Sequence, residues 1–169
     1  MLKLLFYFLL AGPGPIYSLS FTDAQGHLVQ LSAFKGKKIL LVNTASGSSR
    51  ASQYASLEKL YELYKDSLVI IAFPSNDFGH EPATGAVISQ NVVSQYNIQF
   101  IMAANISVTG ATTHPVFQWL TSAALNGLDS NPVGNDFYKF LVDSAGNWKG
   151  VFSDEVDPMS AEMQNAIKQ

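Results

Sequence analysis

Two short apolar runs, separated by a helical pattern, constrain the fold of this chain more than any other feature. Residues 39–43 read ILLVN and residues 68–73 read LVIIAF. Continuous runs of this kind, rich in leucine and β-branched residues, are typical of strands buried on both faces of a parallel sheet. Between the runs, apolar side chains recur every three or four positions, at Tyr54, Leu57, Leu60, Tyr61 and Tyr64. This spacing predicts an amphipathic helix, and therefore a strand–helix–strand unit.

The remaining segments continue the alternation of strands and helices. Residues 17–21 and 28–31 predict a hairpin, residues 83–96 and 115–125 predict helices, and residues 137–143 and 148–152 predict a second hairpin. A closing helix is expected at residues 159–167, after Asp157 and Pro158. This order predicts an α/β sandwich with a central mixed β-sheet flanked by helices and an N-terminal β-hairpin. We expect one domain, at residues 16–169.

The first fifteen residues differ from the rest of the chain. Lys3 supplies one positive charge, residues 4–11 are apolar without interruption, and GPGP at residues 12–15 ends the run. The run is too short to span a bilayer, which requires about 20 residues. It fits a secretory signal peptide, so we expect an exported protein, periplasmic or secreted; the alternatives are an apolar N-terminal segment and a cytoplasmic protein.

Charge and cysteine content exclude several classes of function. The net charge is −3 and no cluster of lysine and arginine occurs, so we do not expect nucleic-acid binding. The chain contains no cysteine. Disulfides, thiolate metal sites, thiol nucleophiles and a lipoprotein anchor are therefore all excluded.

Several strings occur in the order found in one known family. These strings are VNTAS at residues 42–46, FPSN at 73–76, FG at 78–79, EP at 81–82, THP at 113–115 and F-x-KFLVD at 137–143. With them, the chain resembles the glutathione peroxidases over roughly residues 16–157. The resemblance implies a thioredoxin-like fold and an activity in oxidative stress, the reduction of hydrogen peroxide or lipid hydroperoxides. It also implies a cysteine or selenocysteine where the first core strand meets the first helix, supported by a glutamine, a tryptophan and an asparagine.

All four positions that the resemblance assigns to this chemistry are changed. The reactive position falls at Ser48, the glutamine position at Asp77, the tryptophan position at Asn135 and the asparagine position at Asp136. A serine hydroxyl is far more basic than a thiol, and its oxygen cannot form the sulfenic acid that stores two electrons. The carboxylates of Asp77 and Asp136 would oppose an anion at the site. We therefore predict a member of this family without peroxidase activity.

Three alternatives remain open at the level of sequence. Peroxide reduction would return if the native gene encodes cysteine or selenocysteine at position 48. If Ser48, Asp77, Asn135 and Asp136 converge, their oxygen ligands, above all Asp77 and Asp136, could bind a hard cation such as Ca²⁺ or Mg²⁺. Hydrolysis through Ser48 would require a base such as His80.

The sequence also gives expectations for cofactors and partners. We expect no cofactor, and the partner is an unidentified small molecule or protein. We expect a monomer or weak dimer without a stable membrane anchor.

Overall fold

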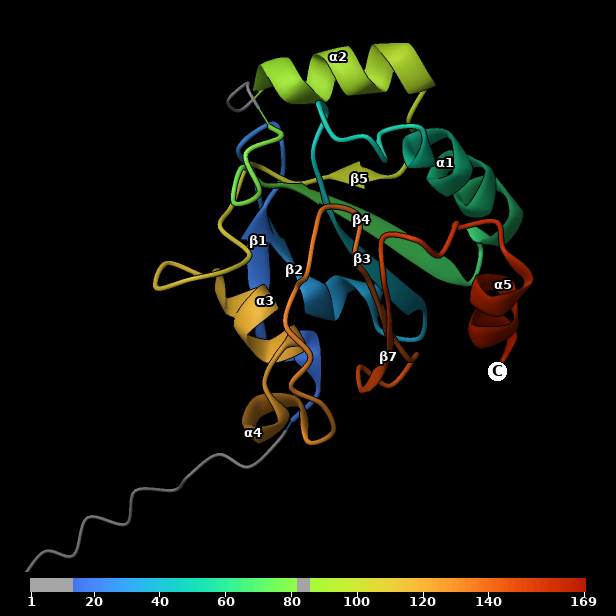
Figure 1. Cartoon of the computed structure of the whole chain (residues 1–169). Helices are drawn as coiled ribbons and strands as arrows, with labels where there is room; N and C mark the ends of the chain where they lie inside the picture. Colours follow the sequence, from blue (N-terminus) through green and yellow to red (C-terminus); the bar gives the residue numbers. More distant parts are fainter. Residues whose placement is uncertain (1–13, 82–85) are drawn as a thin grey trace, which may run out of the picture.

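The computed structural model describes residues 14–81 and 86–169, and Figure 1 shows their arrangement around a central sheet. The sheet has the strand order β5-β4-β3-β6-β7. Strands β3, β4 and β5 are parallel, whereas β6 is antiparallel to β3 and β7 is antiparallel to β6, so the sheet is mixed as expected. The five strands are β3 (Lys38–Thr44), β4 (Leu68–Pro74), β5 (Ile101–Met102), β6 (Lys139–Val142) and β7 (Trp148–Phe152).

Helices cover both faces of the sheet. One face packs against α1 (Gln53–Tyr64), α2 (Ala86–Tyr96) and α5 (Ala161–Lys168), and the other packs against α3 (Pro115–Leu120) and the hairpin of β1 (Ser20–Thr22) and β2 (Leu28–Gln30). Alternate side chains of β3 enter opposite cores: Leu40 and Val42 face the first, and Ile39 and Leu41 face the second. Because both cores are apolar, β3 reads as a continuous apolar run, as its sequence predicts.

The helix predicted at residues 115–125 is wrong in its length. The chain instead forms α3 and a separate short helix, α4 (Ala123–Asn126). The Thr121 hydroxyl donates a hydrogen bond to the Phe117 carbonyl at 2.7 Å, and Ser122 has extended backbone angles. A hydroxyl that bonds back to the preceding turn bends a helix. The Thr121 N–H still donates to the Phe117 carbonyl at 3.1 Å, and the extended angles at Ser122 then take the chain out of the helix.

Three other predicted boundaries also shift. Residues 16–18 form a 3-10 turn rather than the start of the first strand. The strand predicted from residue 137 begins at Lys139, because Phe137 has a φ of 64°, which is left-handed and incompatible with a strand. The closing helix begins at Ala161, where the Ser160 side chain accepts a hydrogen bond from the Met163 N–H. The two-residue strand β5 was not predicted, since so short a run has no recognisable alternation.

Part of what the sequence predicts lies outside the described residues. Of the expected signal peptide at residues 1–15, the structure describes only Gly14 and Pro15, and residues 83–85 of the predicted helix 83–96 are likewise not described. Within residues 14–81 and 86–169, no helix has the length and apolar character that a membrane span requires.

Candidate functional site

The candidate site lies at the carboxyl end of β3, beside the segment that leads into β6. Asn43 joins the two: its side-chain amide donates to the Asn135 carbonyl at 3.0 Å, and its side-chain oxygen accepts from the Tyr138 N–H at 3.1 Å. The Phe137 N–H also donates to the Asn43 carbonyl at 2.6 Å. Because β6 is antiparallel to β3, the residues before β6 return to the point where β3 ends. The fold therefore brings the turn that carries Ser48 next to Asn135 and Asp136.

Ser48 occupies the turn between β3 and α1. Its side chain is almost fully buried, with 8% of the residue exposed, and its Oγ accepts a hydrogen bond from the Arg50 N–H at 3.2 Å. The Gly47 N–H donates to the His80 carbonyl at 2.8 Å, which fixes this turn against the segment that follows β4. Residue 48 thus lies in the turn that leads into α1, and the first N–H groups of that helix bond to the carbonyls of residues 50–52.

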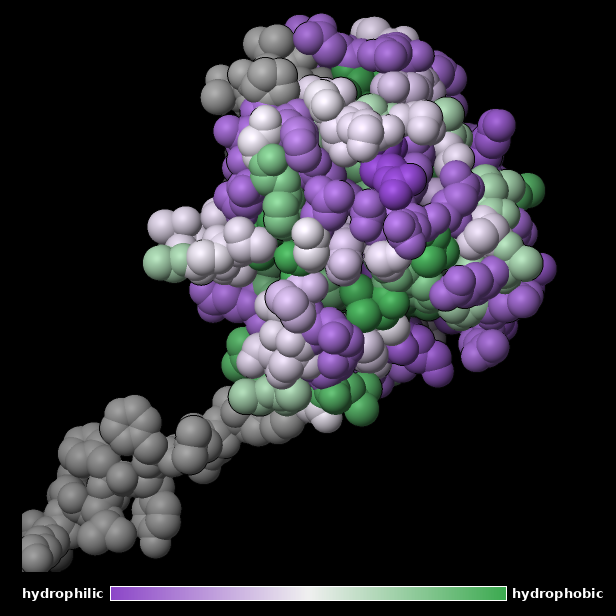
Figure 2. Space-filling model, viewed as in Figure 1, coloured by the Kyte–Doolittle hydropathy of each residue, from purple (hydrophilic) through white to green (hydrophobic). Residues whose placement is uncertain are grey.

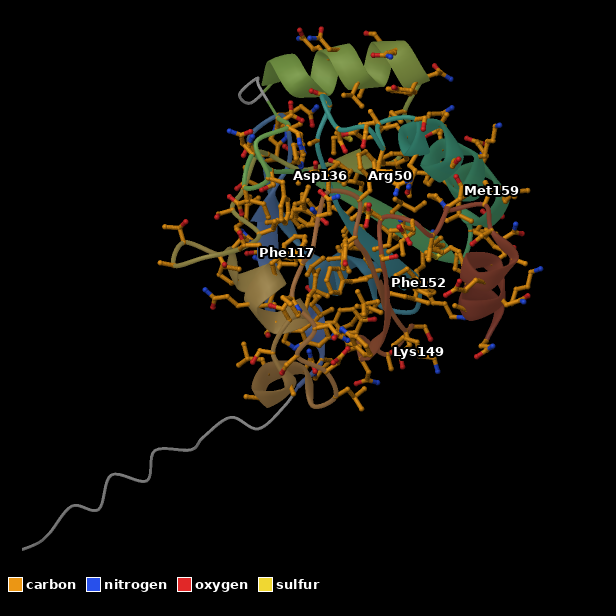
Figure 3. All side chains as sticks on the ribbon, in the orientation of Figure 1. Arg50, Phe117, Asp136, Lys149, Phe152 and Met159 are labelled. Atoms are coloured by element: carbon orange, nitrogen blue, oxygen red, sulfur yellow. The ribbon has the colours of Figure 1, made fainter. Side chains whose placement is uncertain are left out.

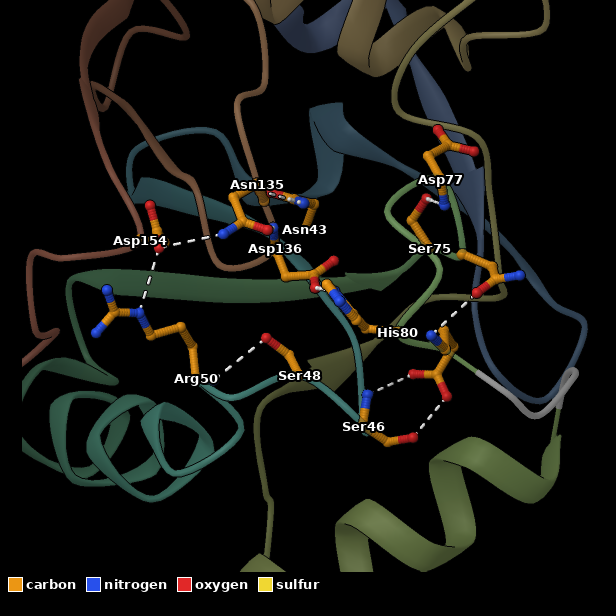
Figure 4. Close-up of polar contacts among 12 residues, drawn as sticks. Asn43, Ser46, Ser48, Arg50, Ser75, Asp77, His80, Asn135, Asp136 and Asp154 are labelled. Atoms are coloured by element: carbon orange, nitrogen blue, oxygen red, sulfur yellow. Dashed lines mark hydrogen bonds and ion pairs between the residues drawn. The ribbon is translucent and has the colours of Figure 1, made fainter.

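Asp136 and His80 form a close pair beside Ser48. The Asp136 Oδ2 and His80 Nδ1 atoms are 2.6 Å apart, and Asp136 is fully buried whereas the His80 side chain is half exposed. The other carboxylate oxygen, Oδ1, is buried without a hydrogen-bond partner among the described residues. Figure 4 shows the imidazole meeting this carboxylate at the same end of the sheet as Ser48. A buried carboxylate with a single partner interacts strongly with that partner.

Asn135 and Arg50 meet at a second carboxylate, that of Asp154. The Asp154 Oδ2 accepts from Arg50 Nε at 3.2 Å and from Asn135 Nδ2 at 3.4 Å, while the Gln53 side chain donates to the Asp154 carbonyl at 2.5 Å. Figure 3 labels Arg50 and Asp136 near each other, and Figure 2 shows a strongly hydrophilic surface at this place in the same view. The Asn135 amide therefore faces Asp154. At position 135 the resemblance implies a tryptophan, whose indole N–H would be directed at the reactive position.

The expected convergence of four side chains fails at Asp77. Its carboxylate accepts from the N–H groups of Val108 and Thr109 at 2.6 and 2.8 Å, and from the hydroxyls of Ser107 and Thr109. Although partial desolvation raises the pKa of Asp77, these backbone and hydroxyl donors hold it below its usual value. The loop at residues 107–109 therefore binds the Asp77 carboxylate, and Figure 4 shows this carboxylate directed away from Ser48.

We expect Asp77→Asn to lower the free energy of unfolding by about 1–2 kcal/mol, because the amide presents N–H groups to donors on residues 107–109. The folded-state pKa lies below the unfolded value, so the carboxylate stabilises the protein above about pH 4, and this contribution is lost as the pH falls through the folded-state pKa. Urea denaturation of both proteins, near neutral pH and near about pH 2.5, measures the difference. Asp66→Asn, at an exposed aspartate after α1, is the control. Equal stability of the Asp77 and Asp66 variants would contradict the role given to Asp77.

The hypothesis of a hard-cation site does not receive support from this geometry. Among the described residues, no group of three or more histidine, aspartate or glutamate side chains is placed to hold a metal ion. Asp77 uses its oxygens on the loop at residues 107–109, and Asp136 pairs with His80. A cation would have to displace both sets of partners.

Glu81 is a structural residue of the site to which the sequence gives no role. Its buried carboxylate accepts from the Ser46 N–H at 2.7 Å and from the Ser46 hydroxyl at 2.6 Å. Its own N–H donates to the Asn76 side chain at 3.1 Å. Burial raises the pKa of Tyr54, and the nearby charges of Glu81 and Asp136 raise it further. The site therefore rests on a neutral phenol and on a carboxylate that fixes the turn after β3.

Comparison with known proteins identifies the family. The model of the family described as glutathione peroxidase matches residues 16–121. The chain belongs to the glutathione peroxidase family. It is 38% identical over 151 residues to the glutathione peroxidase homolog BsaA of Staphylococcus aureus, covering 88% of this chain and 95% of that protein. It is 36% identical over 154 residues to a glutathione peroxidase of Lactococcus lactis, covering 90% and 96%.

Solved structures confirm the thioredoxin-like fold expected of a glutathione peroxidase family member. The crystal structure of Trgpx in apo form superimposes with a TM-score of 0.71 at 30% identity, covering 92% of this chain and 97% of that chain. A thiol:disulfide interchange protein of the thioredoxin family from Chlorobium tepidum gives a TM-score of 0.63 at 17% identity, covering 94% and 96%, and shows the fold alone. This chain thus combines the fold of a family named for peroxide chemistry with a sequence that contains no cysteine.

Proposed function

We propose that this glutathione peroxidase family member does not reduce peroxides by thiol or selenol chemistry. The observation that carries the proposal is the serine at position 48 in a chain without any cysteine. Peroxide reduction in this family's manner needs an atom that accepts an oxygen from the peroxide and later returns to its reduced state, which the oxygen of a serine cannot do. A resolving thiol is missing for the same reason.

The surroundings of Ser48 support the proposal independently of the nucleophile. A fully buried carboxylate, Asp136, lies beside the site, and its charge opposes a second anion there. The Asn135 amide is hydrogen bonded to Asp154 and to the Asp136 N–H. We propose that the fold is retained for binding a small molecule or a protein, as a monomer or weak dimer, rather than for peroxide turnover.

We expect purified protein to consume hydrogen peroxide and a lipid hydroperoxide no faster than a heat-denatured sample, with either glutathione or thioredoxin as the reductant. Ser48→Cys is the matched variant, because it restores the sulfur and leaves the other positions unchanged. After treatment with peroxide and dimedone, mass spectrometry should find a sulfenic-acid adduct at position 48 of the variant, and none in the unmodified protein.

Turnover by the unmodified protein above the denatured control would overturn the proposal. A cysteine or selenocysteine codon at position 48 of the native gene would also overturn it and would restore the alternative of peroxide reduction. Because the Asp136 charge opposes a thiolate at position 48, the adduct should form slowly, and its complete absence would contradict the assignment of residue 48 as the reactive position.

We also propose that the protein is exported, on the basis of the apolar run at residues 4–11. The contacts of Gly14 are compatible with cleavage before that residue. Its carbonyl accepts from the Trp119 indole N–H at 2.9 Å, and its N–H donates to the Leu125 carbonyl at 3.3 Å. N-terminal sequencing of protein from the culture medium or periplasm would test this, and an intact Met1 there would contradict cleavage.

A further inference from the structure

The His80–Asp136 pair has the form that general-base catalysis uses. In a serine–histidine–aspartate triad, a buried carboxylate bonds to imidazole Nδ1, and the other nitrogen takes the proton of the serine. Here Asp136 Oδ2 bonds to His80 Nδ1 at 2.6 Å, and the carboxylate is fully buried. Because the imidazole is half exposed, its Nε2 atom remains available to a neighbouring group.

Ser48 lies at the same end of the sheet as this pair. The Gly47 N–H donates to the His80 carbonyl at 2.8 Å, so Ser48 directly follows a residue in contact with the histidine. Figure 4 shows Ser48 on the same side of the site as His80 and Asp136. In the described part of the chain, Ser48 Oγ bonds to the Arg50 N–H rather than to His80 Nε2. Rotation of the serine side chain would release that bond, and catalytic hydrogen bonds often form only when substrate is present.

We propose that Ser48, His80 and Asp136 hydrolyse esters of small acyl groups. Ser48 Oγ attacks the carbonyl carbon while its proton passes to His80 Nε2. The bond to the leaving alcohol then breaks, and that alcohol takes the proton from His80. Water, deprotonated by the same nitrogen, attacks the acyl-serine; the acyl–oxygen bond breaks, the serine recovers its proton, and a carboxylic acid leaves. No electron transfer is involved, and water is the only co-reactant.

The surroundings define the class of substrate. Only 8% of Ser48 is exposed, so the acyl group that reaches it must be small, such as acetyl. The Arg50 N–H, which is released when the serine side chain rotates, can donate to the carbonyl oxygen, which becomes negative as the serine adds. The Asp136 Oδ1 atom, unpartnered among the described residues, leaves the carboxylate charge free to stabilise the imidazolium that forms. This activity goes beyond the proposed absence of peroxide chemistry and does not depend on it.

The test is the hydrolysis of p-nitrophenyl acetate by the full chain, followed by release of p-nitrophenol and by mass spectrometry of the acylated protein. We expect an acetyl group on the peptide that contains Ser48 and a rate that Ser48→Ala and His80→Gln each lower by about 100-fold. Asp136→Asn should lower kcat with little change in KM, because the carboxylate positions the histidine and does not contact the substrate. Added imidazole should partly restore acylation in His80→Ala, which a merely structural histidine would not show.

The chain offers a matched control for the histidine. His27 is also paired with an aspartate, Asp23 Oδ2 at 3.1 Å from its Nδ1, but it lies on the surface at the hairpin. His27→Gln should leave the rate unchanged, and melting curves should show that all variants fold. An unmodified protein no faster than buffer, acetyl on residues other than Ser48, or equal rates for the unmodified protein and Ser48→Ala would each overturn the proposal. None of these results would affect the peroxide assay.

Discussion

Lys139→Met is expected to raise the free energy of unfolding near neutral pH by about 2 kcal/mol, since it removes a buried charge. Lys139 is fully buried at the start of β6, and its Nζ donates to the Ser153 carbonyl at 2.9 Å. Burial lowers the pKa of Lys139 to about 8, although the charges of Asp154 and Asp157 act in the opposite direction. Replacing a buried ion by an apolar side chain of similar volume is often stabilising, even after the loss of one hydrogen bond.

The stability difference should depend on pH in a defined direction. The unfolded lysine has a pKa near 10.5, above the folded value of about 8. Between these values the unfolded chain binds more protons than the folded chain, so the unmodified protein becomes more stable as the pH rises. Methionine does not titrate. The advantage of the variant should therefore shrink between about pH 8 and about pH 10.

Urea denaturation of both proteins across this pH range measures the effect. Burial of Tyr54 raises its pKa, so its ionisation in the unfolded state lowers stability in alkali, but this contribution is common to both proteins and cancels in the difference. Lys149→Met, at an exposed lysine on β7, should change stability by less than about 0.5 kcal/mol. If the stability difference between Lys139→Met and the unmodified protein is constant over the whole pH range, then Lys139 is not desolvated, which contradicts the structure.

The sequence predicts the sheet well because strands that are buried on both faces read as continuous apolar runs. Strands β3 and β4 are apolar on both faces, and their predicted limits differ from the observed ones by at most one residue at either end. The prediction of one helix at residues 115–125 failed because Ser122 takes extended backbone angles between α3 and α4. A pattern of apolar spacing cannot show that break.

The candidate site is less predictable, because sequence alignment with a family fixes positions and not the directions of side chains. Ser48, Asn135 and Asp136 lie near the carboxyl end of β3. Asp77 follows Asn76 as expected, yet its carboxylate bonds to residues 107–109, whose approach depends on the whole chain between them. The sequence held one chemical signal for this contact. The Asp77 carboxylate is a better partner for consecutive N–H groups than the amide of the glutamine that the resemblance implies at this position.

Glu81→Ala is expected to lower the free energy of unfolding by about 3 kcal/mol, because it removes two short charge-assisted hydrogen bonds from a buried position. Only 2% of Glu81 is exposed, and its carboxylate is the partner of both the N–H and the hydroxyl of Ser46. These bonds connect the segment after β4 to the turn after β3 that carries Ser48. The Ser46 amide should therefore also lose protection from hydrogen exchange, which NMR can follow.

A variant at a surface glutamate is the control, because it removes a negative charge without removing buried hydrogen bonds. Glu62 forms an exposed ion pair with Lys65 at 2.8 Å, so Glu62→Ala should cost less than about 0.5 kcal/mol. Ser46→Ala and the double variant complete a mutant cycle, in which we expect a coupling energy of about 1–3 kcal/mol between residues 46 and 81. If Glu81→Ala costs no more than Glu62→Ala, or if the cycle shows no coupling, Glu81 does not hold the turn. The position of Ser48 would then depend on the Gly47–His80 backbone contact and on the start of α1.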